Sequence, residues 1–249
     1  MGRARGVGVL ATWVMAGGLM ACGGGRPDQD PGVVDSLPST TDCARSGVDG
    51  VTCYPTRGIG DEARPLTTSE RIAVGDGYGD RIANLKFVGF GATTTEVPID
   101  TAHGTTVVQL ADYFDPKAER YSLIVLNACT RWCSYCNQLA DELAAGAASE
   151  HARKGVVFIQ AITEGFDYAP ATTTDIEAFT RDHRASFTVV ADPGGRTLAP
   201  YTGLPVYPFL IVIDARTMEI VQYERGAPRD WSAYLDTALA RVGSRPPKP

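Results

Sequence analysis

The feature that most constrains the fold of this chain is an apolar run that ends shortly before a pair of cysteines. Residues 123–126 are an unbroken aliphatic stretch inside the segment YSLIVLNAC. A run of this kind is typical of a central strand that is covered on both faces. The cysteines follow in the motif WCSYC, residues 132–136, where a helical spacing begins. The chain is therefore expected to turn from a buried strand into a helix at Cys133.

Three segments have helical patterns. The first begins at Cys133, the second has a capping-box pattern of Thr174 and Glu177, and the last runs from about Asp230 to Gly243. Apolar residues at helical spacing form one stripe on the first helix: Cys136, Leu139, Ala140, Leu143, Ala144 and Ala147.

Strand-like runs alternate with these helices. They occupy residues 83–91, 105–114, 155–162, 187–192, 208–214 and 219–224, the second of them ending in a short helical turn. The order of strands and helices predicts one α/β domain over residues 76–243, with a mixed central β-sheet and helices on both faces. The remaining residues, 244–249, are expected to be a C-terminal tail.

The N-terminus reads as a targeting segment. Two arginines precede an apolar run that is too short and too glycine-rich for a membrane span, so residues 1–21 are predicted to be a signal peptide. The run ends in Leu-Met-Ala-Cys, which resembles the bacterial lipoprotein cleavage box. That resemblance implies acylation of Cys22, and Gly23 after it favours the outer membrane over the inner one. The alternative is an ordinary secretory signal.

Residues 22–75 are rich in glycine, proline, serine and aspartate, which predicts a flexible tether. Within it, Cys43 and Cys53 flank a short loop that contains glycine. Since an exported protein meets an oxidising environment, these two cysteines are expected to form a structural disulfide.

The charge balance bears on the partners. The chain has 23 basic and 29 acidic residues, and removal of residues 1–21, with two arginines and no acids, leaves 21 basic residues and a net charge of −8. An acidic surface argues against nucleic acid as a partner.

The predicted position of the motif indicates thiol chemistry. Cys133 lies where the helix presents unpaired N–H groups and the positive end of its dipole, which is expected to lower the pKa of the thiol. Cys136 lies one turn later on the apolar stripe. Cys133 is therefore predicted to attack a disulfide, and Cys136 to resolve the mixed disulfide that forms.

The segment LIVLNACTRWCSYC resembles the strand and WCxxC motif of the thioredoxin superfamily, in particular its extracytoplasmic TlpA/ResA-like branch and the related AhpC/TSA group. A second segment, GLPVYPFLIVID, resembles the cis-proline loop of that superfamily, with Pro208 before the strand and Asp214 at its end. The resemblance covers residues 76–243. It implies a thioredoxin-like fold in which the cis-proline lies against the cysteines, Tyr207 offers its backbone to the substrate, and Trp132 flanks the site.

The chain departs from that pattern at four positions. Asn127 replaces a titratable aspartate, Leu139 an acidic residue, and Asp141 a proline that kinks the helix. The proton acceptor for Cys136 is therefore not identified by the resemblance. Cys129 stands at a position usually held by an aromatic residue, and it is interpreted as a small buried hydrophobe rather than a third redox thiol.

Other uses of the two cysteines fit the sequence less well or remain open. A zinc site lacks a second ligand pair, since the three histidines are scattered, and covalent haem is excluded because Asn137 follows Cys136. A purely structural disulfide remains open. A peroxiredoxin-like peroxidase is favoured by Thr130, but Leu126 replaces the proline of its pattern. A redox-inert binding module that uses its exposed aromatic residues is a third alternative.

The sequence thus predicts a membrane-tethered thiol–disulfide oxidoreductase on the periplasmic side of the cell envelope. Cys133 and Cys136 are its expected catalytic residues, and Trp132, Tyr207 and Pro208 its substrate-binding residues. No cofactor and no metal are expected. The expected partners are thiols and disulfides of exported proteins and an upstream dithiol protein.

Overall fold

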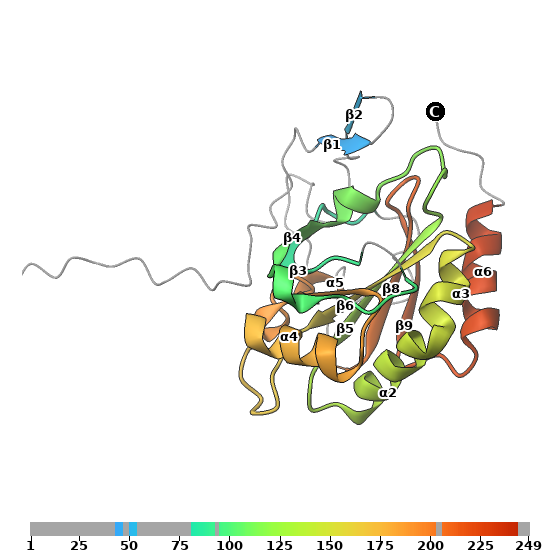
Figure 1. Cartoon of the computed structure of the whole chain (residues 1–249). Coiled ribbons are helices and arrows are strands. Elements are labelled where there is room, and N and C mark those ends of the chain that lie inside the picture. The colour runs from blue at the N-terminus through green and yellow to red at the C-terminus, as the bar shows by residue number, and fades with distance from the viewer. Residues whose placement is uncertain (1–42, 47–49, 54–80, 93–94, 203–205, 244–249) are drawn as a thin grey trace, which may run out of the picture.

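The computed structural model describes residues 81–92, 95–202 and 206–243, together with the backbone of two short paired strands, β1 (Cys43–Ser46) and β2 (Gly50–Cys53). The main body is a seven-stranded mixed sheet with the strand order β4-β3-β7-β6-β5-β8-β9 (Figure 1). Its strands are β3 (Lys86–Phe90), β4 (Thr106–Gln109), β5 (Leu123–Cys129), β6 (Val156–Ile162), β7 (Thr188–Ala191), β8 (Phe209–Asp214) and β9 (Ile220–Arg225).

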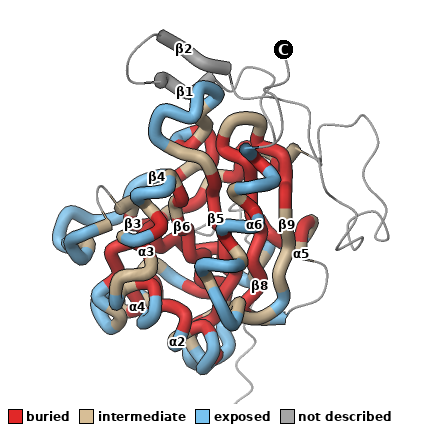
Figure 2. Tube along the Cα trace, turned by 90° about the vertical axis from the view of Figure 1, so that its right-hand side faces the viewer, coloured by how far each residue is buried: buried red, intermediate tan, exposed pale blue. Residues whose placement is uncertain are grey.

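Strand β5 lies in the interior of the sheet. It pairs in parallel with β6 on one side and antiparallel with β8 on the other, and all seven of its residues are buried. The apolar run therefore forms a central strand, as the sequence predicts. Figure 2 shows the buried residues concentrated along these inner strands.

The helices cover the sheet unevenly. One face packs against α2 (Ser134–Glu142), α4 (Thr173–Asp182) and α6 (Trp231–Gly243), and the other carries the short helices α5 (Ala199–Thr202) and η2 (Leu110–Tyr113). Helices therefore lie on both faces, which confirms the predicted architecture. Two further short turns are η1 (Thr101–His103) and η4 (Pro193–Gly195).

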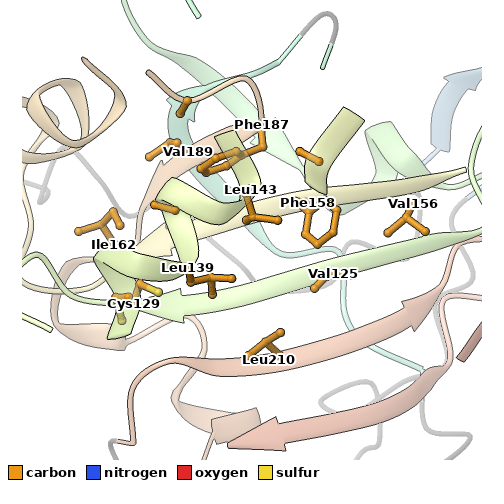
Figure 3. Close-up of a cluster of buried hydrophobic side chains, with 14 of the residues drawn as sticks. Val125, Cys129, Leu139, Leu143, Val156, Phe158, Ile162, Phe187, Val189 and Leu210 are labelled. Atoms are coloured by element: carbon orange, nitrogen blue, oxygen red, sulfur yellow. The ribbon is translucent and has the colours of Figure 1, made fainter. Parts of the chain in front are cut away.

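The helix after the cysteine motif is interrupted. A π-helical segment, η3 (Leu143–Ala147), separates α2 from α3 (Ala148–Ala152), and Gly146 within it has a φ of 137°. Only glycine adopts that conformation without strain. The predicted apolar stripe is buried up to Leu143, and Figure 3 shows Leu139 and Leu143 among the buried hydrophobic side chains. Its last two residues, Ala144 and Ala147, are only partly buried.

The cap of α4 differs from the prediction by two residues. Thr172 is the N-cap, and it forms the capping box with Asp175 rather than the predicted pair of Thr174 and Glu177. The prediction was wrong because two threonines of the TTT run, Thr172 and Thr174, have an acidic residue three positions later. The backbone of Thr172 is extended, as an N-cap requires.

The N-terminal predictions lie largely outside the described residues. This applies to the signal peptide at 1–21, to Cys22 and to most of the tether. The backbone register of β1 and β2 places Cys43 opposite Cys53, while the side chains of both lie outside the described part. In the portion that the structure describes, no helix is long and apolar enough to cross a membrane.

Candidate functional site

The cysteine motif lies at the start of α2, directly after the carboxyl end of β5. Cys133 is the N-cap residue, with an extended backbone, and the Cys136 N–H donates to Cys133 Sγ at 3.4 Å. The thiol thus occupies the place that a serine or aspartate side chain takes at an ordinary N-cap. Cys133 is 7% exposed and Cys136 is fully buried, so both thiols are buried and Cys133 keeps only a small contact with solvent.

A loop distant in sequence faces Cys133. The Tyr207–Pro208 peptide bond is cis, and the Cys133 thiol donates to the Tyr207 carbonyl oxygen at 3.6 Å. Strand β8 starts at the next residue and pairs with β5, which brings the loop to the cysteine end of the sheet. The arrangement matches the cis-proline loop implied by the resemblance.

The electrostatics of the two thiols differ from the sequence expectation. Burial raises the pKa of Cys133 to about 11, more than the N–H donors of Cys136 and Tyr135 lower it. Burial, followed by a hydrogen bond to Cys129, raises the pKa of Cys136 further. The prediction of a lowered pKa for Cys133 was therefore wrong, because the thiol is desolvated by the loop that covers it. Cys133 remains the more acidic of the pair.

Aromatic side chains surround the exposed side of Cys133. The Trp132 ring lies 5.3 Å from the ring of Tyr168 and 6.1 Å from that of Tyr207, measured between centroids. Trp132 Nε1 donates to Glu164 Oε2 at 2.7 Å, which ties the indole to the loop after β6. Trp132 and Tyr207 are therefore brought together with Pro208 at the motif, as expected from the sequence.

The loop of residues 164–170 supplies two aromatic residues that sequence reasoning missed. Phe166 and Tyr168 are 61% and 69% exposed, and Tyr168 has a φ of 63°. The loop is closed by an antiparallel bridge between its ends, and Arg131 lies over the Phe166 ring at 4.3 Å. The available signal was two large aromatic residues in a short polar loop, where no core requires them.

Most of the large hydrophobic side chains that are exposed in the described part of the chain lie near the cysteine motif or in two loops. Seven large hydrophobic side chains are exposed among the described residues, and five belong to the motif, the loop 164–170 or the loop before β8. We call these five the aromatic rim: Trp132, Tyr135, Phe166, Tyr168 and Val206. A cluster of this kind marks a site for contact with another molecule.

Cys129 lies at the last position of β5, beneath α2, as labelled in Figure 3. It is fully buried, as predicted, but it is not surrounded by apolar atoms alone, because Asn127 Nδ2 donates to its sulfur at 3.1 Å. Its thiol is free, as are those of Cys133 and Cys136. Among the described residues, no group of three or more histidine, cysteine or acidic side chains is arranged to hold a metal ion.

A mixed sheet with a cysteine pair at a helix N-terminus, facing a cis-proline loop, defines a thioredoxin-like protein. Residues 88–223, more than half of the chain, match the AhpC/TSA family. The chain therefore belongs to the AhpC/TSA family. No curated protein matches the sequence.

Several solved structures are similar to this one. A DsbF homologue from Corynebacterium diphtheriae is 21% identical, with 67% of this chain and 88% of that chain covered and a TM-score of 0.47. A secreted thiol-disulfide isomerase from Corynebacterium glutamicum is 21% identical, with 66% and 88% covered and a TM-score of 0.47. A secreted disulfide oxidoreductase from Mycobacterium tuberculosis is 21% identical, with 61% and 95% covered and a TM-score of 0.40.

Proposed function

We propose that this protein is an exported thiol–disulfide oxidoreductase that exchanges disulfides with other exported proteins. The observation that carries the proposal is the position of Cys133 Sγ. It lies at the N-terminus of α2, next to the thiol of Cys136 and 3.6 Å from the Tyr207 carbonyl of the cis-proline loop. A reactive sulfur, a second sulfur within reach and a backbone edge for a substrate chain are the parts that exchange requires.

The reaction follows from the two thiols. The Cys133 thiolate attacks one sulfur of a substrate disulfide, so that a Cys133–substrate disulfide forms and the other substrate sulfur leaves as a thiolate that takes up a proton. Cys136 then loses its proton and attacks Cys133 Sγ, which releases the second substrate thiol. The substrate gains two electrons and two protons, and the protein becomes the Cys133–Cys136 disulfide.

The substrate surface in this proposal is the aromatic rim together with Tyr207 and Pro208. Aromatic side chains bind extended apolar segments at low cost in conformational entropy, because each has only two side-chain torsions to fix. Glu164 and the acidic balance of the chain favour substrates with basic residues near the disulfide. A dithiol protein would return the Cys133–Cys136 disulfide to the reduced state.

The proposal includes a lipid anchor at Cys22 and a structural disulfide between Cys43 and Cys53. The anchor is supported by the Leu-Met-Ala-Cys box, and Gly23 after the cysteine favours the outer membrane over the inner one. The disulfide is supported by the register of β1 and β2, which sets the two cysteines directly opposite each other. Peptide mapping of the oxidised protein should find them linked to each other, and a Cys22→Ser variant should lose acylation and membrane retention.

The peroxidase alternative has less support. A peroxiredoxin-like site needs the hydroxyl of Thr130 beside the reactive sulfur. Thr130 Oγ1 is buried and has no hydrogen-bond partner among the described residues, so it does not bond to Cys133. The binding-module alternative makes a different prediction, since its thiols would not react at all.

Trapping of mixed disulfides tests the proposal. Cys136→Ser, incubated with a disulfide-containing unfolded polypeptide, should accumulate a covalent adduct at Cys133 that mass spectrometry detects. Cys133→Ser should form no adduct and should lose all exchange activity, which makes it the matched control. Adducts in Cys133→Ser but none in Cys136→Ser would reverse the two roles. Adducts in neither variant would favour the binding module.

A further inference from the structure

Arg131, the residue before the tryptophan of the cysteine motif, joins three parts of the site. Its guanidinium lies 4.3 Å from the centre of the Phe166 ring. The same group is 2.9 Å from Asp182 Oδ2 and 3.6 Å from Asp175 Oδ1, both on α4. Only 11% of the arginine side chain is exposed. One side chain thus connects the motif, the loop 164–170 and α4.

The backbone next to this side chain is bonded to the same loop. The Arg131 N–H donates to the Glu164 carbonyl oxygen at 3.0 Å, and Trp132 Nε1 donates to the Glu164 carboxylate. The Trp132 ring also lies against the ring of Tyr168. Two consecutive residues ahead of Cys133 therefore each contact one of the two exposed aromatic rings of the loop.

The base and the tip of the loop are held in different ways. An antiparallel bridge between Glu164 and Pro170 closes the base. Residues 166–170 are all exposed, and 61% of Phe166 is accessible to solvent. The packing of the core therefore does not fix the direction of the Phe166 ring, whereas the Arg131 guanidinium over its face can fix it.

Helix α4 holds the guanidinium itself in place. The carboxylate of Asp175 is fixed by the capping box with Thr172. A Cβ atom at Gly165 would lie 3.0 Å from Asp175 Oδ1, so the backbone of the loop runs directly against this carboxylate. Asp182 provides the second carboxylate. Because a guanidinium is planar and rigid, Arg131 can bind carboxylates through its N–H groups and stack on a ring with its face.

We propose that Arg131 is a positioning residue that holds the Phe166 ring in the aromatic rim, and so makes the protein prefer disulfides in polypeptides to small disulfides. The inference rests on the proposed function, since it concerns the substrate surface of that reaction. Arg131 forms no bond to a substrate sulfur and exchanges no electrons. Without it, a polypeptide must order the Phe166 ring as it binds, and this cost raises KM. The chemistry at Cys133, which a small disulfide reports, stays the same.

Steady-state kinetics with two substrates tests this role. Arg131→Met keeps the length of the side chain without its charge. It should raise KM for an unfolded polypeptide disulfide about fivefold, the size expected for one cation–π contact. The kcat and the rate with oxidised glutathione should not change. Arg181→Met is the matched control, because Arg181 of α4 is 61% exposed and pairs with Glu177 at 3.5 Å. It should leave KM unchanged.

A double-mutant cycle shows whether Arg131 acts through Phe166. In a Phe166→Ala background, Arg131→Met should raise KM by less than about 1.5-fold, because no ring is left to hold. The same fivefold rise in both backgrounds would overturn the inference. An equal loss of activity with the polypeptide and with oxidised glutathione would overturn it as well, since Arg131 would then act on the chemistry or on the whole fold.

Asp182→Ala provides a second test that does not depend on the folding of Arg131→Met. It removes the carboxylate nearest to the guanidinium. Asp182 is 59% exposed and ends α4, where a negative charge does not stabilise a helix, so the stability of the protein should hold. KM for the polypeptide should rise about twofold, and an unchanged KM would overturn the inference. A wild-type protein that reduces neither substrate would overturn the proposed function, and this inference with it.

Discussion

The aromatic rim and the buried cluster of side chains below it meet at the cysteine motif, and Cys133 and Cys136 both belong to that cluster. The rim leaves large side chains in solvent, Tyr168 with a left-handed backbone. The cluster contains buried side chains such as Leu139, which is fully buried. The side chains of the rim therefore stay exposed in the folded protein, whereas the side chains of the core have little freedom to move. Substitutions in the rim should change activity, and substitutions in the core should change stability.

The largest effect is expected in the core. Leu139→Ala removes a fully buried side chain from α2 and should lower the free energy of unfolding by about 2–5 kcal/mol, because a cavity remains. Gln138→Ala, on the exposed side of the same helix, is the matched control and should stay within about 0.5 kcal/mol of wild type. Denaturant unfolding of the reduced proteins measures both. A similar small loss in both variants would contradict the distinction between core and rim.

The pH dependence of the reduction potential tests whether the thiols of Cys133 and Cys136 both stay protonated in the reduced protein. With both thiols protonated up to pH about 11, reduction takes up two protons with two electrons, so the potential should fall by about 59 mV per pH unit from pH 7 to 10. Equilibration with a dithiothreitol redox buffer at each pH gives the slope. Had the helix N-terminus lowered the pKa of Cys133 to about 7, the slope above that pH would be about 30 mV.

In the rim, Phe166→Ala combined with Tyr168→Asn should lower kcat/KM for an unfolded polypeptide disulfide about tenfold, because two anchoring rings are lost. The rate with oxidised glutathione should not change, and stability should hold, since asparagine tolerates the left-handed backbone of Tyr168. Val107→Ala truncates another exposed hydrophobic side chain, on β4 and outside the rim, and serves as the control. Equal losses with both substrates would mean that the rim acts on the chemistry itself.

The smallest expected effect is a change in the free energy of unfolding at the N-cap of α4, the helix that supports the rim. Asp175 of α4 belongs to the capping box with Thr172, and its carboxylate lies 3.6 Å from the Arg131 guanidinium that covers Phe166. Thr172→Ala should lower the free energy of unfolding by about 1 kcal/mol. Thr174→Ala, two residues into the helix, should change it by less than about 0.5 kcal/mol. Thermal unfolding compares the stability of the two variants. A larger loss in Thr174→Ala would support Thr174 as the N-cap, as predicted from the sequence.

Much of the fold could be predicted because burial leaves a pattern in the sequence. The apolar run of β5, the helix after Cys133 and the strand after Pro208 all follow from spacing or from the resemblance, and the structure contains them. The interruption at Gly146 could not be predicted, since glycine within a helical pattern is compatible with an unbroken helix.

The candidate site was predicted in its parts but not in its energetics. The sequence places Cys133 at a helix N-terminus, but the loop that desolvates it starts about 70 residues later, so the sign of the pKa shift depends on tertiary packing. The sequence predicts only a loop at Phe166 and Tyr168, because neither residue belongs to a helical or strand periodicity. Cys129 was correctly expected to be buried, while its hydrogen bond with Asn127 depends on the geometry of the strand end.

The position of Cys129 on β5 determines when this thiol can be oxidised under oxidative stress. Strand β5 is bonded to a neighbour on each side and is buried throughout, so Cys129 meets solvent only when the whole domain opens. Oxidation should therefore reach Cys133 first, where a sulfenic acid condenses with the Cys136 thiol to the disulfide and water, and should reach Cys129 only at the rate of global unfolding. The fraction of modified Cys129 in a stored sample would then record how often that molecule has unfolded.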